Sequence, residues 1–178
     1  MPYLLLCLLL AAAPLSAQTE PPADFSVLLD SLGLTLNLPA DHDFRVRPNA
    51  ENDYLASQYT LVSRRAKTEL RFHLVPESET DFYYRRPHLR TGLLQVNLGS
   101  NAENAVTAVH SFGEEELAVL NADWARMYTF RPKTAYAGRR QAQLVALYRE
   151  GRGLAYVVIL FDKAPGSVED LQLALNFR

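Results

Sequence analysis

An uninterrupted apolar segment near the end of the chain places the strongest limit on its fold. Residues 154–161 read LAYVVILF and contain no charged side chain. A strand that is apolar on both faces belongs inside a sheet whose two faces are both covered. Residues 141–148 form a second apolar strand, and the REGRG connection between the two carries the glycines expected of a hairpin. The sequence therefore predicts a central hairpin in a covered sheet.

Periodic patterns elsewhere in the chain predict the remaining elements. Strands are expected at residues 34–38, 44–47, 58–63, 67–75, 105–112 and 124–130. Helices are expected at residues 25–32, 87–98 and 113–120, and a last helix after Ser167 closes the chain. Asp24 is the expected cap of the first helix. Strands joined by hairpins predict an α+β fold, with helices packed on a mainly antiparallel sheet.

In two of these elements, the order of polar and apolar side chains indicates which residues share a face. In the strand at 67–75, Leu70, Phe72 and Leu74 alternate with Glu69, Arg71 and His73. This alternation predicts a sheet with one solvated face at this strand. In the helix at 87–98, Leu89, Leu93, Val96 and Asn97 share one side, with Leu94 beside it.

The first residues have the pattern of a secretory signal peptide. An apolar run at residues 4–13 is followed by small residues that end at Ala17, where cleavage is expected. The run is shorter than the ~20 residues that span a bilayer, so no membrane span is expected after cleavage. We therefore predict a signal peptide at 1–17, a flexible lead at 18–23 and a single globular domain at 24–178. The predicted location is secreted or periplasmic.

Cysteine content and charge exclude several function classes. Cys7 is the only cysteine and lies inside the apolar run, so the mature chain would lack disulfides, thiol nucleophiles and cysteine metal sites. A net charge of −2 argues against nucleic acid as a partner. The chain has no G-x-S-x-G motif, and the glycines at 151 and 153 lack the lysine of a phosphate-binding loop. No cofactor is predicted, and the chain is not expected to be an enzyme.

The segment DFYYRRPHLR, at residues 81–90, is the candidate binding surface. Pro87 suits the first position of a helix, which places Arg85 and Arg86 just before an N-terminus that already carries partial positive charge. Such an arrangement suits an anion or the carboxylate of a partner. The candidate residues are Tyr83, Tyr84, Arg85, Arg86, His88 and Arg90. In the alternative interpretation, these arginines pair with acids of the same chain, such as Glu77, Glu79 or Asp81.

Two other polar clusters have ordinary structural explanations. Asp41, His42 and Asp43 offer three metal ligands in a row, but a solvated loop after Pro39 explains them as well, and no metal is predicted. The three glutamates at 114–116 fit the start of a helix, where the dipole favours anions.

Parts of the sequence resemble the PsbP-like fold group. The similar segments are GLTLNLP, LNADWARMYTF and QLVALYREGRGLAYVVILF, with NF near the end of the chain. The group includes the extrinsic photosystem II protein, a Ran-binding nuclear import factor and periplasmic DcrB-like proteins. The resemblance implies an α/β/α sandwich and a non-enzymatic role in binding or assembly. It carries no catalytic residue over to this chain.

Three functions remain open from the sequence. The first is an exported, non-enzymatic binding or assembly module whose partner is an envelope protein. The second is a carrier of a small anionic or lipid-like ligand, held in a pocket between sheet and helix. The third is a hydrolase with a dispersed site that involves His42, His73 or His110.

Overall fold

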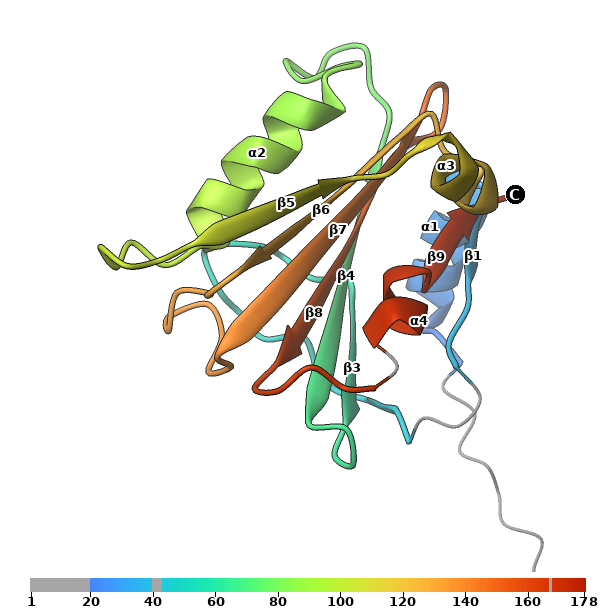
Figure 1. Cartoon of the computed structure of the whole chain (residues 1–178). Helices are drawn as coiled ribbons and strands as arrows, with labels where there is room; N and C mark the ends of the chain where they lie inside the picture. Colours follow the sequence, from blue (N-terminus) through green and yellow to red (C-terminus); the bar gives the residue numbers. More distant parts are fainter. Residues whose placement is uncertain (1–19, 40–42, 167) are drawn as a thin grey trace, which may run out of the picture.

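A computed structural model describes residues 20–39, 43–166 and 168–178 (Figure 1). The predicted signal peptide, Asp41 and His42 lie outside the described residues. The helices are α1 (Ala23–Leu32), α2 (Pro87–Leu98), α3 (Glu114–Leu120) and α4 (Val168–Gln172). The strands are β1 (Leu34–Leu36), β2 (Arg45–Val46), β3 (Tyr59–Ser63), β4 (Thr68–Pro76), β5 (Thr107–Ser111), β6 (Trp124–Phe130), β7 (Gln141–Arg149), β8 (Gly153–Phe161) and β9 (Leu175–Phe177).

The main sheet has seven strands in the order β2-β3-β4-β8-β7-β6-β5, and its strand pairings are antiparallel. All nine residues of β8 are buried. The predicted hairpin of β7 and β8 is therefore confirmed, and β8 lies inside the sheet as its apolar pattern predicts. The α+β class with a mainly antiparallel sheet is confirmed as well.

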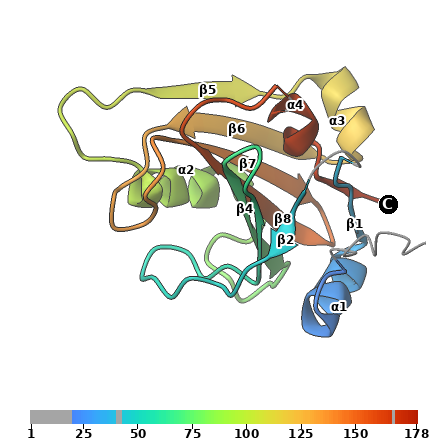
Figure 2. The same ribbon diagram turned by 90° about the horizontal axis from the view of Figure 1, so that it is seen from below.

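Helices cover both faces of this sheet. Figures 1 and 2 show α2 on one face and α1, α3, α4 and the β1–β9 pair on the other. One core cluster includes Phe25, Leu32, Phe72 and Phe177 and lies beneath α1 and the β1–β9 pair. The second cluster includes Leu98, Tyr136, Tyr156 and Val158 and lies on the side of α2. In the part of the chain that the structure describes, no helix is long and apolar enough to cross a membrane.

The predicted helix at the end of the chain is wrong in its last residues. Helix α4 ends at Gln172, and the chain continues as β9, which pairs with β1 so that Leu175 lies opposite Leu36. Leu175 and Phe177 are both buried. Residues two apart in a strand point to the same face, so β9 turns both side chains toward the core. Leu171 and Leu175 have helical spacing in sequence, but the partner strand β1 decides the conformation of Leu175.

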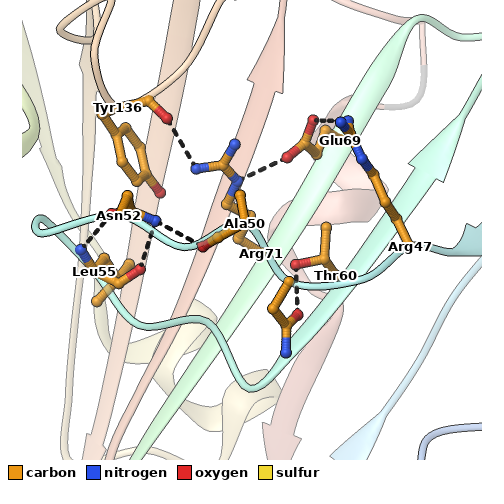
Figure 3. A network of polar contacts seen from close by, with 9 residues as sticks. Arg47, Ala50, Asn52, Leu55, Thr60, Glu69, Arg71 and Tyr136 are labelled. Atoms are coloured by element: carbon orange, nitrogen blue, oxygen red, sulfur yellow. Dashed lines mark hydrogen bonds and ion pairs between the residues drawn. The ribbon is translucent and has the colours of Figure 1, made fainter.

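The prediction of a solvated face on β4 is also wrong. Glu69 is 7% exposed and Arg71 is 6% exposed, so both charges are largely shielded from bulk water. The loop after β2 and the segment around Tyr136 cover this side of the strand, as Figure 3 shows. The polar side chains do share one side of the strand, but a polar side chain does not indicate solvent where a loop closes over it.

Helix α1 begins at Ala23, two residues before the start at Phe25 that the sequence predicts. Pro22, not Asp24, occupies the N-cap position, and it offers no side-chain hydrogen bond. Asp24 lies within the first turn, where its carboxylate accepts a hydrogen bond from the Phe25 N–H at 2.9 Å. An acid in the first turn is still favourable because of the helix dipole.

Candidate functional site

The segment that leads from β4 to α2 is anchored on the β7–β8 turn. The Tyr148 hydroxyl donates a hydrogen bond to the Glu77 carboxylate at 2.9 Å, and the Gly151 N–H donates to its other oxygen. The Glu77 N–H in turn donates to the Arg152 carbonyl at 3.1 Å. Burial, followed by the bond to Glu77, raises the pKa of Tyr148 above its usual range. The chain just before the candidate segment is therefore fixed to the central hairpin.

A glycine makes this close approach possible. Gly153 has a φ of +135°, and a Cβ built on it would lie 2.3 Å from the Val75 carbonyl oxygen. No larger residue fits without moving one backbone away from the other. The REGRG connection predicted from sequence thus links the two strands of the hairpin. Its Gly153 also allows the end of β4 to pack closely against this turn.

Two of the three candidate arginines are paired with acids of the same chain. The Arg85 guanidinium lies 2.8 Å from Glu150 and 3.9 Å from Glu77, and it stacks 5.0 Å from the centre of the Tyr84 ring. Arg85 also has a positive φ of 54°, an uncommon conformation for a side chain of this size. Its charge is compensated by Glu150 within this chain.

The second of these pairs joins Arg90 to Asp81. Both side chains are partly buried, and the guanidinium contacts the carboxylate directly. Asp81 also accepts the Tyr83 N–H at 2.7 Å. This backbone hydrogen bond, followed by the contact with Arg90, lowers the pKa of Asp81. The pair fixes the turn before α2 to the first turn of the helix.

Arg86 and His88 are arranged differently from the other two cations. Both side chains are exposed, and within residues 20–39, 43–166 and 168–178 neither has an ion pair. The Arg86 guanidinium lies 5.8 Å from the centre of the Phe82 ring, and Arg86 occupies the N-cap of α2 without a side-chain cap bond. Arg85 is exposed as well but is paired with Glu150, so Arg86 and His88 are the exposed candidate cations that remain available to a partner.

The outer face of α2 adds an apolar surface next to Arg86. The large exposed side chains of this face are Leu89 (45% exposed), Leu93 (56%) and Val96 (66%), and Phe82 (75%) lies in the segment before the helix, near Arg86. The opposite side of the helix meets the sheet through Pro87, Thr91 and Leu98, all of which are buried. We call Phe82, Arg86, Leu89, Leu93 and Val96 the α2 outer surface. Sequence reasoning found the shared side of Leu89, Leu93 and Val96 but did not show that it points away from the core.

A separate polar cluster is buried on β4 (Figure 3). The Arg71 Nε lies 2.7 Å from Glu69, and its Nη1 donates to the Tyr136 carbonyl at 3.1 Å. The guanidinium also stacks 4.7 Å from the centre of the Tyr136 ring. Arg47 approaches Glu69 from the exposed side at 3.4 Å. These contacts satisfy both buried charges, so the cluster has the character of a structural ion pair rather than of a reactive site.

The loop that covers this pair is ordered by its own side-chain bonds. The Asn52 amide donates to the carbonyls of Ala50 and Leu55, and its oxygen accepts the Tyr54 and Leu55 N–H groups. Burial raises the pKa of Tyr136 to about 12, so its hydroxyl stays protonated at neutral pH. The covered side of β4 is thus closed by a self-supporting loop.

The two described histidines of the hydrolase hypothesis do not converge. His73 lies on β4 and stacks 6.0 Å from the Tyr156 ring on the α2 side of the sheet. His110 lies on β5 and contacts Glu116, the residue that caps α3, at 3.0 Å. Three strands separate β4 from β5, which corresponds to about 19 Å between strands. Among the described residues, no group of three histidines, cysteines or acids is arranged to hold a metal.

The space between the sheet and the start of α2 is too small for a carried ligand. The cavity there, lined by Pro76, Tyr84, Arg90 and Leu154 among others, has a volume of about 30 Å³. That is roughly the volume of one water molecule. A larger hollow of about 840 Å³ lies elsewhere, between the β3–β4 turn and the segment at residues 162–166.

Comparison with family models, with curated proteins and with solved structures gives no match for this chain. The resemblance to the PsbP-like fold group therefore stays a prediction. The candidate surface rests on the geometry of the chain itself.

Proposed function

We propose that this chain is an exported, non-enzymatic binding or assembly module that contacts a protein partner through the α2 outer surface. The observation that carries the proposal is the orientation of α2. Three large apolar side chains of this helix face solvent, although the sheet lies on its other side. Clustered exposed apolar residues beside a cation are characteristic of protein contact sites.

The geometry at the start of α2 supports the same role. Arg86 opposes the dipole of its own helix and has no acid partner among the described residues. A carboxylate on a partner would satisfy this guanidinium, and the neighbouring Phe82 ring would gain burial in the same contact. The PsbP-like resemblance and the predicted signal peptide are consistent with an exported assembly factor. They add support without identifying the partner.

Other sequence-derived functions have less support from the geometry. A ligand carrier needs a cavity, and the one between the sheet and the start of α2, where the candidate residues lie, has room for about one water molecule. A hydrolase needs acid, base and nucleophile groups close together, and His73 and His110 face opposite sides of the sheet.

A crosslinked pull-down from envelope fractions tests the proposal. The bait is the exported chain, compared with a Leu93→Glu variant and with a Val119→Glu variant. Val119 is equally apolar and 65% exposed, but it lies on α3, on the other side of the sheet. The proposal expects a partner that is recovered with the unchanged chain and with Val119→Glu but lost with Leu93→Glu. Equal recovery with all three baits would contradict it.

A further inference from the structure

An open hollow at one end of the main sheet is lined by two lysines and an arginine. It has a volume of about 840 Å³ and lies between the β3–β4 turn and the segment that follows β8, at the lower end of the sheet in Figure 1. Most of the residues that line it are exposed, including Arg65, Lys67 and Lys163. Fifteen of the chain's 18 basic residues are arginines, yet two of its three lysines lie here. A hollow of this volume has room for a small organic ligand.

Strand pairing brings cations from neighbouring strands to this end of the sheet. Strand β8 lies between β4 and β7, and its last residue, Phe161, pairs with the first residue of each. Lys67 directly precedes β4, Arg140 directly precedes β7, and Lys163 follows β8 by two residues. Neighbouring strands are about 4.8 Å apart, so these three cations extend from backbone positions that lie side by side.

The two acids that line the hollow already have partners within the chain. Asp43 accepts a hydrogen bond from the Ser63 hydroxyl at 2.5 Å and one from the Arg65 N–H at 3.4 Å. Asp162 accepts one from the Arg139 guanidinium at 2.8 Å. The bond from Ser63 lowers the pKa of Asp43, and the bond from Arg139 lowers the pKa of Asp162. Both acids are therefore ionised and already engaged.

The basic side chains around the hollow have no such partners. In the part of the chain that the structure describes, no ion pair is formed by the side chains of Arg65, Lys67, Arg140 or Lys163. The acids of α4 do not line this hollow. Like charges gathered at one place repel one another, and an anion placed among them offsets this repulsion. The cluster is thus complementary to a ligand with more than one negative charge.

Lys67 has a backbone conformation that is unfavourable for its residue type. Its φ is 51°, in the left-handed region where a Cβ crowds the following carbonyl group. Glycine and asparagine are the residues usually found at such a position in a hairpin turn. A lysine therefore weakens the β3–β4 turn. Unfavourable backbone conformations of this kind gather at binding sites, which makes Lys67 a candidate ligand contact.

We infer that this hollow is a binding site for a phosphate-bearing ligand, whose phosphate oxygens accept hydrogen bonds from the Lys67 and Lys163 ammonium groups. Arg65 lines the same hollow and adds to its positive charge. Lysine binds phosphate as a compact point charge, and a phosphate monoester places up to two negative charges on one small group. The hollow is larger than one phosphate, so we expect an organic part as well, as in a sugar phosphate or a lipid headgroup.

The inferred site is separate from the α2 outer surface. It lies at the start of β4, whereas the segment that leads to α2 leaves the other end of this nine-residue strand. That length corresponds to about 26 Å. The inference therefore goes beyond the proposed function, and either can fail without the other.

Two probes that present a phosphate monoester from different sources test the inference. Glycerol 3-phosphate offers it free in solution, and phosphatidylcholine vesicles with about 30% phosphatidic acid offer it on a lipid headgroup. Calorimetry follows the first probe and co-sedimentation follows the second. The unchanged chain should bind at least one of them, and a soluble ligand should have a dissociation constant of about 0.1–1 mM. Lys67→Gln/Lys163→Gln should weaken the binding about 10-fold or more.

A matched variant separates the site from the net charge of the chain. Arg86→Gln/Arg152→Gln removes the same charge from exposed arginines at the other end of the sheet, and it should bind the probes as the unchanged chain does. Binding only to vesicles would support a lipid headgroup as the ligand, and binding only to glycerol 3-phosphate would support a soluble ester. Absence of binding to both probes overturns the inference. Equal binding by the two double variants overturns it as well.

Lys67→Gly keeps the result independent of misfolding. Glycine adopts the φ of Lys67 readily, so the melting temperature of the ligand-free chain should rise by about 1–3 °C. Binding of the same probe should weaken about 3- to 10-fold. A fall in melting temperature would mean that Lys67 serves the fold, and unchanged binding would mean that its ammonium does not contact the ligand. Either result overturns the assignment of Lys67 to this site.

Discussion

Strand β4 and helix α2 both carry residues on the side where a simple polarity pattern would not place them. On β4, Glu69 and Arg71 are charged but buried. On α2, Leu89, Leu93 and Val96 are apolar but exposed. The two cases differ in whether other residues of the chain provide partners for these side chains. The buried charges have each other, Tyr136 and Arg47 as partners, whereas the exposed apolar side chains have no comparable cover.

This contrast separates a structural exception from a functional one. A buried ion pair with its hydrogen bonds satisfied needs nothing from outside the chain. An apolar row that faces water gains free energy only when something else covers it. We therefore expect changes in the Glu69–Arg71 pair to alter the stability of the fold, and changes in the α2 outer surface to alter binding.

The largest effect is expected from breaking the buried pair. Arg71→Met should lower the free energy of unfolding by about 3–5 kcal/mol, because it leaves Glu69 buried without its closest partner. The double variant Glu69→Leu/Arg71→Met should regain most of this loss. Arg47→Ala, which removes only the exposed partner of Glu69, should cost less than about 1 kcal/mol. Urea unfolding measures all three, and equal losses for Arg71→Met and Arg47→Ala would contradict the structural role.

The two sides of α2 should respond very differently to the same substitution. Leu98 is fully buried, so Leu98→Ala should cost about 2–4 kcal/mol of stability. Leu93→Ala on the outer surface should change the stability of the monomer by no more than about 0.5 kcal/mol. Unfolding at low protein concentration checks this pair. A large loss with Leu93→Ala would mean that the outer side of the helix is covered by the chain itself.

A smaller effect of opposite sign is expected at the centre of α2. Gly92→Ala should stabilise the monomer by about 0.5–1 kcal/mol, because the added methyl group meets nothing and the helix loses less backbone entropy on folding. Thermal unfolding of dilute protein measures the gain. Destabilisation by alanine would show that the helix is strained at this position.

The smallest effect is a change of stability with pH from His73, a neighbour of the buried pair on β4. Burial, which outweighs the contact with the Ala56 carbonyl, lowers the pKa of His73 from 6.5. The unfolded state then binds the proton first as the pH falls, so this group should weaken the fold only below about pH 6.5. Carboxylates titrate at lower pH. Melting temperatures from pH 7.5 to 5.5 should fall more for the unchanged chain than for His73→Gln, and parallel curves would refute the assignment.

Several elements could be predicted because a local pattern leaves little choice. Pro87 marks the start of α2, and the bounds expected for that helix match the structure. The aromatic alternation of β6 and the continuous apolar run of β8 likewise identify their strands. At the candidate site, the unusual position of Arg86 was visible in sequence. The pairing of Arg85 with Glu150 was not, because the β7–β8 turn brings together residues far apart in the chain.

The sequence by itself determined where the strands and helices of the main sheet form, since their periodicity and turn residues act over a few neighbouring positions. Only the tertiary structure decided that Leu175 belongs to a strand, that Glu69 and Arg71 are buried, and that the apolar side of α2 points outward. Each of these depends on a partner distant in sequence: β1, the loop around Asn52, or the sheet beneath Leu98. Periodicity shows which side chains share a face, but packing against distant segments determines what that face meets.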